Sequence, residues 1–149
     1  MRCGTIVDDN KDGVAWCHGA AGILLSKIQV YNCLKEENIY MDDETVELLD
    51  KVKRDIRHSY KKLSEYPYRD SFCLCHGTFG NMWILEEAIK SRELLKDTAS
   101  FCDFYIKPEK IKLLPQEKLN PGLMNGYGGV LYYLLRLYKE DLPNVLMFD

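Results

Sequence analysis

Two short stretches of the sequence place a cysteine and a histidine side by side: Cys17 with His18, and Cys75 with His76. Thiolates and imidazoles are the side chains that bind Zn²⁺, and they also serve as nucleophiles and bases in catalysis. A third thiol, Cys73, lies two residues before Cys75. The same residues have a structural alternative, because a buried cysteine is a small hydrophobic residue and a loop histidine can cap a helix.

Length and composition predict one ordinary globular domain over residues 1–149. The chain has 149 residues, of which 46% are hydrophobic and 29% are charged. That proportion of apolar residues is enough for a hydrophobic core, so neither a metal nor disulfides are needed to hold the fold together.

Charge and hydropathy exclude several classes of partner. The net charge is −3 with acids and bases interspersed, so no basic stripe indicates binding to nucleic acid. No apolar run has the length of a transmembrane helix, and the first residues lack the apolar region of a secretory signal. We therefore expect a cytoplasmic protein.

The sequence contains six cysteines. An even number can indicate a disulfide framework in a small secreted chain. This chain has its own core and no secretory signal, so we expect free thiols at Cys3, Cys33, Cys73 and Cys102. We expect Cys73 to be buried and to point away from any site at Cys75.

A glycine motif occurs three times along the chain, about every 50 residues, which is typical of stacked helical hairpins. Each copy reads x-x-G-x-x-G and is followed by an apolar run. The copies are CHGAAGI at 17–23, CHGTFGN at 75–81 and MNGYGGV at 124–130. In each copy, we expect the first glycine to lie in a loop and the second to allow neighbouring helices to pack closely.

Hydrophobic periodicity predicts an all-α fold. The segments 22–34, 80–95 and 128–140 are apolar on most sides, as buried inner helices are. Residues 42–64 instead carry apolar side chains at i+3 and i+4 spacing, which predicts an amphipathic outer helix. The pattern therefore predicts helical-hairpin repeats, in which outer helices cover inner ones.

Stacked repeats would bring equivalent loops together at one end of the molecule. Cys17 would then lie near Cys75 and His76, although 17 and 75 are far apart in sequence. Two thiolates and one imidazole suit Zn²⁺, and three protein ligands leave a fourth position open, as in catalytic zinc sites. From the spacing alone, buried cysteines with a capping histidine remain the alternative.

The three motifs resemble the last three glycine motifs of the lanthionine synthetase C-like family. The forms WCHG, LCHG and PGLMNG most resemble the C-terminal cyclase domain of class II lanthipeptide (lantibiotic) synthetases. The resemblance implies an α/α toroid, of which this chain holds about three of seven repeats. It also implies that Cys17, Cys75 and His76 are the ligands of Zn²⁺.

The same resemblance implies a reaction. Family members join a peptide cysteine thiol to a dehydroalanine or dehydrobutyrine, which forms a thioether (lanthionine) ring. Zinc suits this step because it lowers the pKa of a bound thiol. The expected partner is therefore a dehydrated precursor peptide that carries cysteine thiols.

The sequence also departs from the family pattern. The family's acid/base histidine and aspartate precede the first zinc cysteine by more residues than this sequence has before Cys17. We therefore expect a C-terminal fragment of a cyclase, or a truncated relative of one, that is inactive alone. His18 is a candidate proton donor, with an ordinary loop histidine as the alternative.

Three other functions remain open. One is an inactive zinc-binding module for a thiol peptide or a partner, and another is a zinc-free helical repeat that mediates interactions. A relative acting on small thiols such as glutathione is a further option.

Three repeats of a ring would leave two open flanks, so we expect self-association through exposed apolar residues. The expected flank residues are Ile23, Leu24, Trp83, Ile84, Leu131 and Leu134.

Overall fold

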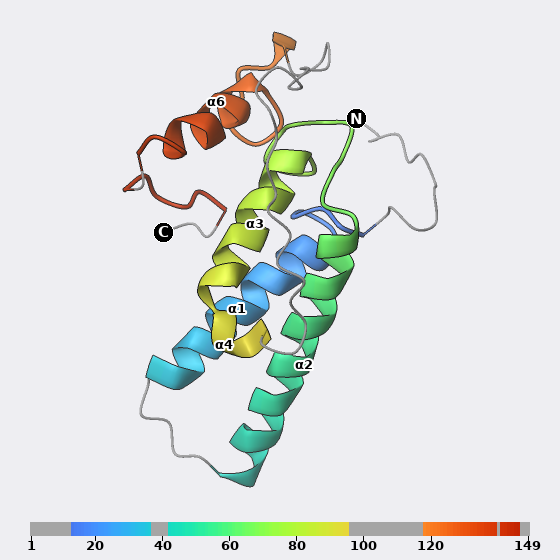
Figure 1. The fold of residues 1–149 in the computed structure, drawn as a ribbon, viewed down its shortest axis with the longest axis vertical. Coiled ribbons are helices and arrows are strands. Elements are labelled where there is room, and N and C mark those ends of the chain that lie inside the picture. The colour runs from blue at the N-terminus through green and yellow to red at the C-terminus, as the bar shows by residue number, and fades with distance from the viewer. Residues whose placement is uncertain (1–12, 37–41, 96–117, 140, 147–149) are drawn as a thin grey trace.

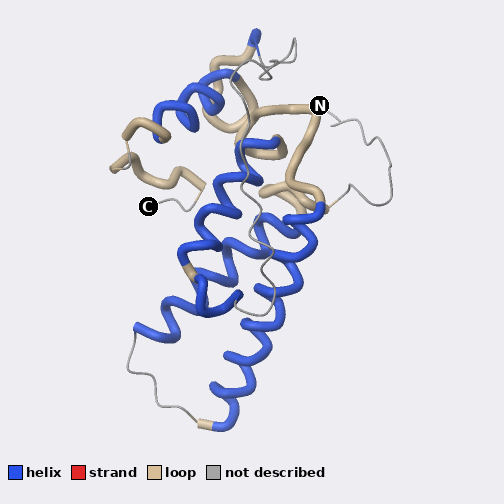
Figure 2. The backbone as a smooth tube through the Cα atoms, in the orientation of Figure 1, coloured by secondary structure: helices blue, strands red, loops and turns tan. Residues whose placement is uncertain are grey.

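A computed structural model describes residues 13–36, 42–95, 118–139 and 141–146 (Figure 1). The helices in these ranges are α1 (Ala20–Glu36), α2 (Asp43–Glu65), α3 (Thr78–Lys90), α4 (Arg92–Leu95) and α6 (Tyr127–Arg136). Residues 118 and 119 are also helical, and the remaining described backbone is loop, with one isolated bridge between Val14 and Gly19 and no strand (Figure 2). The prediction of an all-α fold is confirmed.

Helices α1 and α2 form a helical hairpin and lie along one another (Figure 1). Helix α2 begins where predicted, because the side chain of Asp42 accepts a hydrogen bond of 2.8 Å from the backbone N–H of Thr45. Its apolar stripe faces the core, whereas its other face is polar. The buried residues of α2 are Val52, Ile56, Ser59, Tyr60 and Leu63.

Helix α3 is the central element of the described fold, since it contacts α1, α2, α4 and α6 (Figure 1). It is apolar on most sides, as predicted for an inner helix. From Thr78 to Leu85 every residue of α3 is buried. Burial of large apolar side chains such as Trp83 and Leu85 stabilises the fold by roughly 1.5–3 kcal/mol for each side chain.

Two predicted helix boundaries differ from the structure. The segment 80–95 is not one helix, because α3 ends at Lys90, and the backbone of Ser91 leaves the helical region before α4 begins. Arg57 of α2 donates a 3.1 Å hydrogen bond to the backbone oxygen of Leu94, so α4 packs as a separate turn. The last inner helix ends at Arg136, earlier than position 140.

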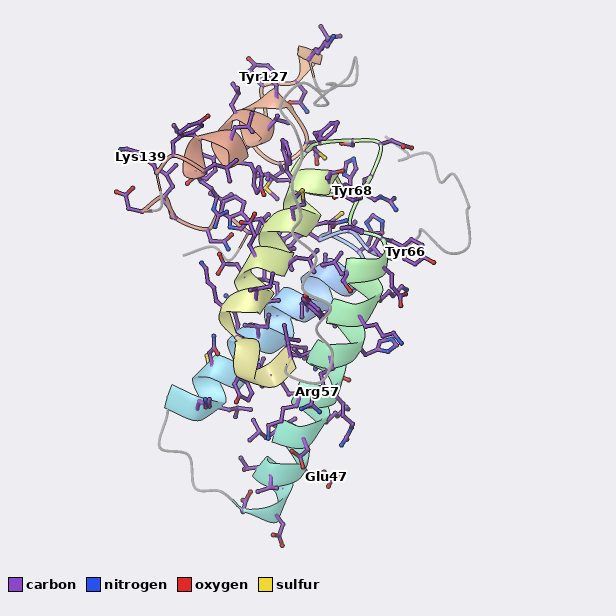
Figure 3. The ribbon with its side chains drawn as sticks, in the orientation of Figure 1. Glu47, Arg57, Tyr66, Tyr68, Tyr127 and Lys139 are labelled. Atoms are coloured by element: carbon purple, nitrogen blue, oxygen red, sulfur yellow. The ribbon has the colours of Figure 1, made fainter. Side chains whose placement is uncertain are left out.

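The loop between α2 and α3 is held by polar side chains of α3. Thr78 Oγ1 accepts a 2.8 Å hydrogen bond from Arg69 N–H and donates one of 2.9 Å to Arg69 C=O. Asn81 Nδ2 donates to Pro67 C=O at 3.3 Å. Figure 3 shows Tyr66 and Tyr68 on this loop, at the opposite end of α2 from Glu47.

No helix in the described ranges is both long and apolar enough to cross a membrane.

Candidate metal centre

Three loops of similar construction precede the three inner helices. We call residues 13–19 the first glycine loop, residues 71–77 the second and residues 120–126 the third. In each loop, the first N–H of the following helix donates to the carbonyl seven residues earlier. The pairs are Ala20–Gly13 at 2.6 Å, Thr78–Ser71 at 2.8 Å and Tyr127–Asn120 at 3.0 Å.

The second glycine of each motif is required by a close backbone approach. A Cβ at Gly80 would lie 1.8 Å from the carbonyl oxygen of Leu74, and one at Gly129 would lie 1.9 Å from that of Leu123. A Cβ at Gly22 would lie 2.1 Å from the carbonyl oxygen of Trp16, which belongs to its own loop. We expected these glycines to admit a neighbouring helix. The expectation was wrong, because the closest atom belongs to the preceding loop of the same repeat.

Backbone hydrogen bonds join the three loops side by side. The N–H of Cys17 donates to the C=O of Cys75 at 3.4 Å, and the N–H of Cys75 donates to the C=O of Met124 at 2.9 Å. These three residues occupy the same position in their loops. Adjacent loops are therefore related in the same way, first to second and second to third.

This arrangement brings together the three residues that the sequence singled out as metal ligands. One ligand atom each from Cys17, Cys75 and His76 lies within 4.8 Å of the others. Cys17 is exposed, whereas Cys75 and His76 are half-buried. Ligand atoms in a tetrahedral zinc site lie about 3.3–3.8 Å apart, so shifts of about 1 Å would close this group around an ion.

The chemistry of the donors also fits zinc. Two thiols and an imidazole are soft and borderline ligands, which favour zinc over magnesium or calcium. Both ligand loops end at a helix N-terminus, where free N–H groups give a partial positive charge that suits anionic groups. Three protein ligands would leave a fourth position for a further thiol.

Comparison with known proteins agrees with this geometry. Residues 3–149 match the protein family described as lanthionine synthetase C-like. This chain belongs to that family.

A curated relative supports the same assignment. Over 142 residues the chain is 31% identical to the Lacticin 481/lactococcin biosynthesis protein LcnDR2 of Lactococcus lactis subsp. lactis. The alignment covers 89% of this lanthionine synthetase C-like chain and 15% of the relative, so the chain spans only that fraction of the relative's length. No solved structure matches the chain.

His18 lies beside the ligand group of this lanthionine synthetase C-like chain. Its Nδ1 is 3.0 Å from the Sγ of Cys17, and its side chain is exposed. The group of three potential ligands does not include His18. Its role as a proton donor stays a prediction.

Cys73 is buried as expected, but it does not point away from the site. Burial raises the pKa of its thiol. Hydrogen bonds with the side chain of His76 and with Ser71, and a further one with the backbone of His76, outweigh burial and leave this pKa below its ordinary value. The buried thiol of Cys73 therefore contacts the imidazole of His76, and the expectation from the spacing that Cys73 points away was wrong.

A polar cluster between α3 and α6 was not predicted from the sequence. Tyr133 donates a 2.6 Å hydrogen bond to one carboxylate oxygen of Glu86, and Arg136 binds the other at 2.5 Å. The guanidinium of Arg136 also lies 4.5 Å from the ring centroid of Trp83. Burial, and next the charge of Glu86, raise the pKa of Tyr133 above its ordinary value. We call Glu86, Tyr133 and Arg136 the α3–α6 clamp, because they hold the third repeat against the second.

The described thiols and the expected flanks can now be placed. Among the described residues, Cys17, Cys33, Cys73 and Cys75 form no disulfide, whereas Cys3 and Cys102 lie outside the described residues. Of the expected flank residues, Ile23 and Leu131 are 49% and 59% exposed. The others were assigned wrongly or only in part, because Leu24, Trp83 and Ile84 are buried in the core and Leu134 is partly buried.

Proposed function

We propose that this chain is the zinc-bearing portion of a lanthipeptide cyclase, which activates a peptide cysteine thiol for addition to a dehydroalanine or dehydrobutyrine. The observation that carries the proposal is the approach of Cys17, Cys75 and His76 to within 4.8 Å of one another. Family membership and the biosynthetic role in the relative's name support the same reaction class.

In this proposal, the three ligands hold Zn²⁺ and leave one position for the thiol of the substrate peptide. When bound, zinc would lower the pKa of that thiol and favour the thiolate at neutral pH. The second glycine loop supplies two of the three ligands, and Cys73 orients one of them, His76.

The addition needs one proton to leave and one to arrive. The thiol loses its proton, a C–S bond forms at the β-carbon of the dehydro residue as the π bond between its α- and β-carbons breaks, and the α-carbon gains a proton. No oxidant or reductant is needed. His18 is our candidate donor of that second proton, because its imidazole lies 3.0 Å from Cys17 Sγ.

The proposed partner is a dehydrated precursor peptide with cysteine thiols, in line with the biosynthetic role named for the relative. We further propose that the three repeats form adjoining parts of an α/α toroid and that the protein works in the cytoplasm. The four described cysteines form no disulfide, which is in keeping with a reducing compartment.

The test is the proton balance of thiol binding. A free cysteine thiol has a pKa of about 8.5, so at pH 7.5 its capture as a thiolate releases nearly one proton. Calorimetric titration of a short cysteine peptide into the zinc-loaded chain, in buffers of different ionisation enthalpy, measures this release. The proposal predicts about one proton per peptide, no binding of the matched serine peptide and loss of both effects in Cys75→Ala. Peptide binding without proton release, or unchanged binding to Cys75→Ala, would contradict it.

A further inference from the structure

Each glycine loop carries a pair of residues directly before its first glycine. The pairs are Cys17 with His18, Cys75 with His76 and Met124 with Asn125. The ligand group does not take one pair alone. It takes the first residue of the first pair and both residues of the second.

The relation between the first two loops is repeated between the second and the third. The same backbone bond links Cys17 to Cys75 and Cys75 to Met124, and each loop closes onto its helix by the same contact seven residues back. Applying the relation once more groups Cys75 with Met124 and Asn125. The backbone bond from Cys75 N–H to Met124 C=O brings the residue after Met124, Asn125, close to the second glycine loop.

The second group has different chemistry from the first. A thioether and a carboxamide cannot be deprotonated to zinc ligands, so this group does not compete for the metal. Met124 is half-buried and packs against the core, whereas Asn125 is exposed. The carboxamide offers two N–H donors and one oxygen acceptor, the groups that pair with a peptide unit.

We propose that Asn125 is a positioning residue that hydrogen-bonds the backbone of the thiol-bearing peptide while the peptide thiol occupies the fourth metal position. The inference rests on the proposed function and adds a source of substrate recognition. A peptide held at two points, by its sulfur at the metal and by its backbone at Asn125, has its cysteine fixed in direction as well as in place. Its thiolate then meets the dehydro residue from one side.

Two ligands separate recognition of the backbone from recognition of the thiol. The protein is loaded with Co²⁺ in place of zinc, and its visible spectrum reports each thiol that enters the fourth position. One ligand is a cysteine with an acetylated amine and an amidated carboxyl, which has two peptide groups. The other is 2-mercaptoethanol, which has none.

Asn125→Ala should weaken binding of the capped cysteine by about 3- to 10-fold, the effect of one lost hydrogen bond, and leave 2-mercaptoethanol unchanged. Asn125→Gln, which keeps the amide, should restore most of the affinity. The matched control is Asn32→Ala, an exposed asparagine on α1, which should change neither ligand.

Equal weakening of both ligands, or of neither, would overturn the role of Asn125 and leave the metal centre standing. Failure of the parent chain to bind Co²⁺ would instead overturn the proposed function, and the role of Asn125 with it.

Discussion

The second and third glycine loops share their backbone contacts but differ in the chemistry of their side chains. Both close onto the following helix through a carbonyl seven residues back, and both press a backbone oxygen against a glycine one turn into that helix. The second loop carries Cys75 and His76, whereas the third carries Met124 and Asn125. The comparison shows that the glycines let each loop pack against its helix, while the two residues before the first glycine determine which side-chain groups the loop presents.

The largest expected effect is loss of the shared backbone. Gly80→Ala and Gly129→Ala should destabilise the fold alike, by about 3 kcal/mol or more, because each Cβ would lie under 2 Å from a backbone oxygen that cannot move aside. Urea unfolding followed by circular dichroism measures this. Gly122→Ala is the control, since its Cβ would meet only the side-chain end of Asn120, at 2.8 Å. If Gly129→Ala behaved like the control, the two loops would not be equivalent.

The equivalence of the loops can be tested by moving the metal site from the first and second loops to the second and third. Cys17→Ala should weaken zinc binding at least about 100-fold, because one of three ligands is lost. Adding Met124→Cys and Asn125→His to that variant should restore binding, since Cys75 would then serve the second and third loops. Zinc affinity by competition with a chelator measures both steps.

The control for this transfer is the same pair of residue types at an unrelated surface site. Leu137→Cys with Tyr138→His, at two exposed positions, should restore nothing. Recovery in the control, or none in the designed variant, would count against the equivalence of the loops.

The α3–α6 clamp should have a smaller effect on stability. Arg136→Ala should cost about 1–3 kcal/mol, because it leaves the part-buried carboxylate of Glu86 without its charged partner. Lys53→Ala, which breaks an ion pair with the exposed Asp50 on α2, should cost under about 0.5 kcal/mol. Similar losses in the two variants would show that the clamp contributes no more than a surface pair.

The raised pKa of Tyr133 implies that the contribution of this residue to the free energy of unfolding is complete below pH 10.0 and falls as the pH rises further.

The smallest expected effect is on association. Leu131 and Leu135 of α6 are 59% and 50% exposed, and an open pocket lined partly by Tyr127 lies beside Leu131. We expect weak self-association through this face at high protein concentration. Light scattering after size exclusion measures it, and Leu131→Lys should reduce it while the exposed Leu48→Lys of α2 should not. A strictly monomeric parent chain would contradict the expectation.

Much of the fold, and the proximity of the three candidate ligands, could be predicted from the sequence. The i+3 and i+4 spacing of apolar residues predicted the outer helix α2, and segments that are apolar on most sides predicted the inner helices α1, α3 and α6. The repeated glycines predicted that equivalent loops meet, and the proximity of Cys17 to Cys75 and His76 is confirmed.

The remainder depends on contacts that local sequence does not encode. The backbone bonds between loops involve groups that every residue carries. The contact of Cys73 with His76 depends on the path of the second loop, and the clamp joins Glu86 to residues about one repeat away. Ser91 ends α3 although the apolar pattern continues past it.

The most direct test of the central claim is the zinc content of protein purified without a histidine tag. The account predicts about one zinc per chain for the parent and for Cys33→Ala, whose exposed thiol lies on α1 and outside the ligand group. It predicts almost none for Cys75→Ala, because the ligand group would lose one of its two thiols while the backbone bond to the third loop is kept. Undiminished zinc in a folded Cys75→Ala variant would contradict the assignment of this centre.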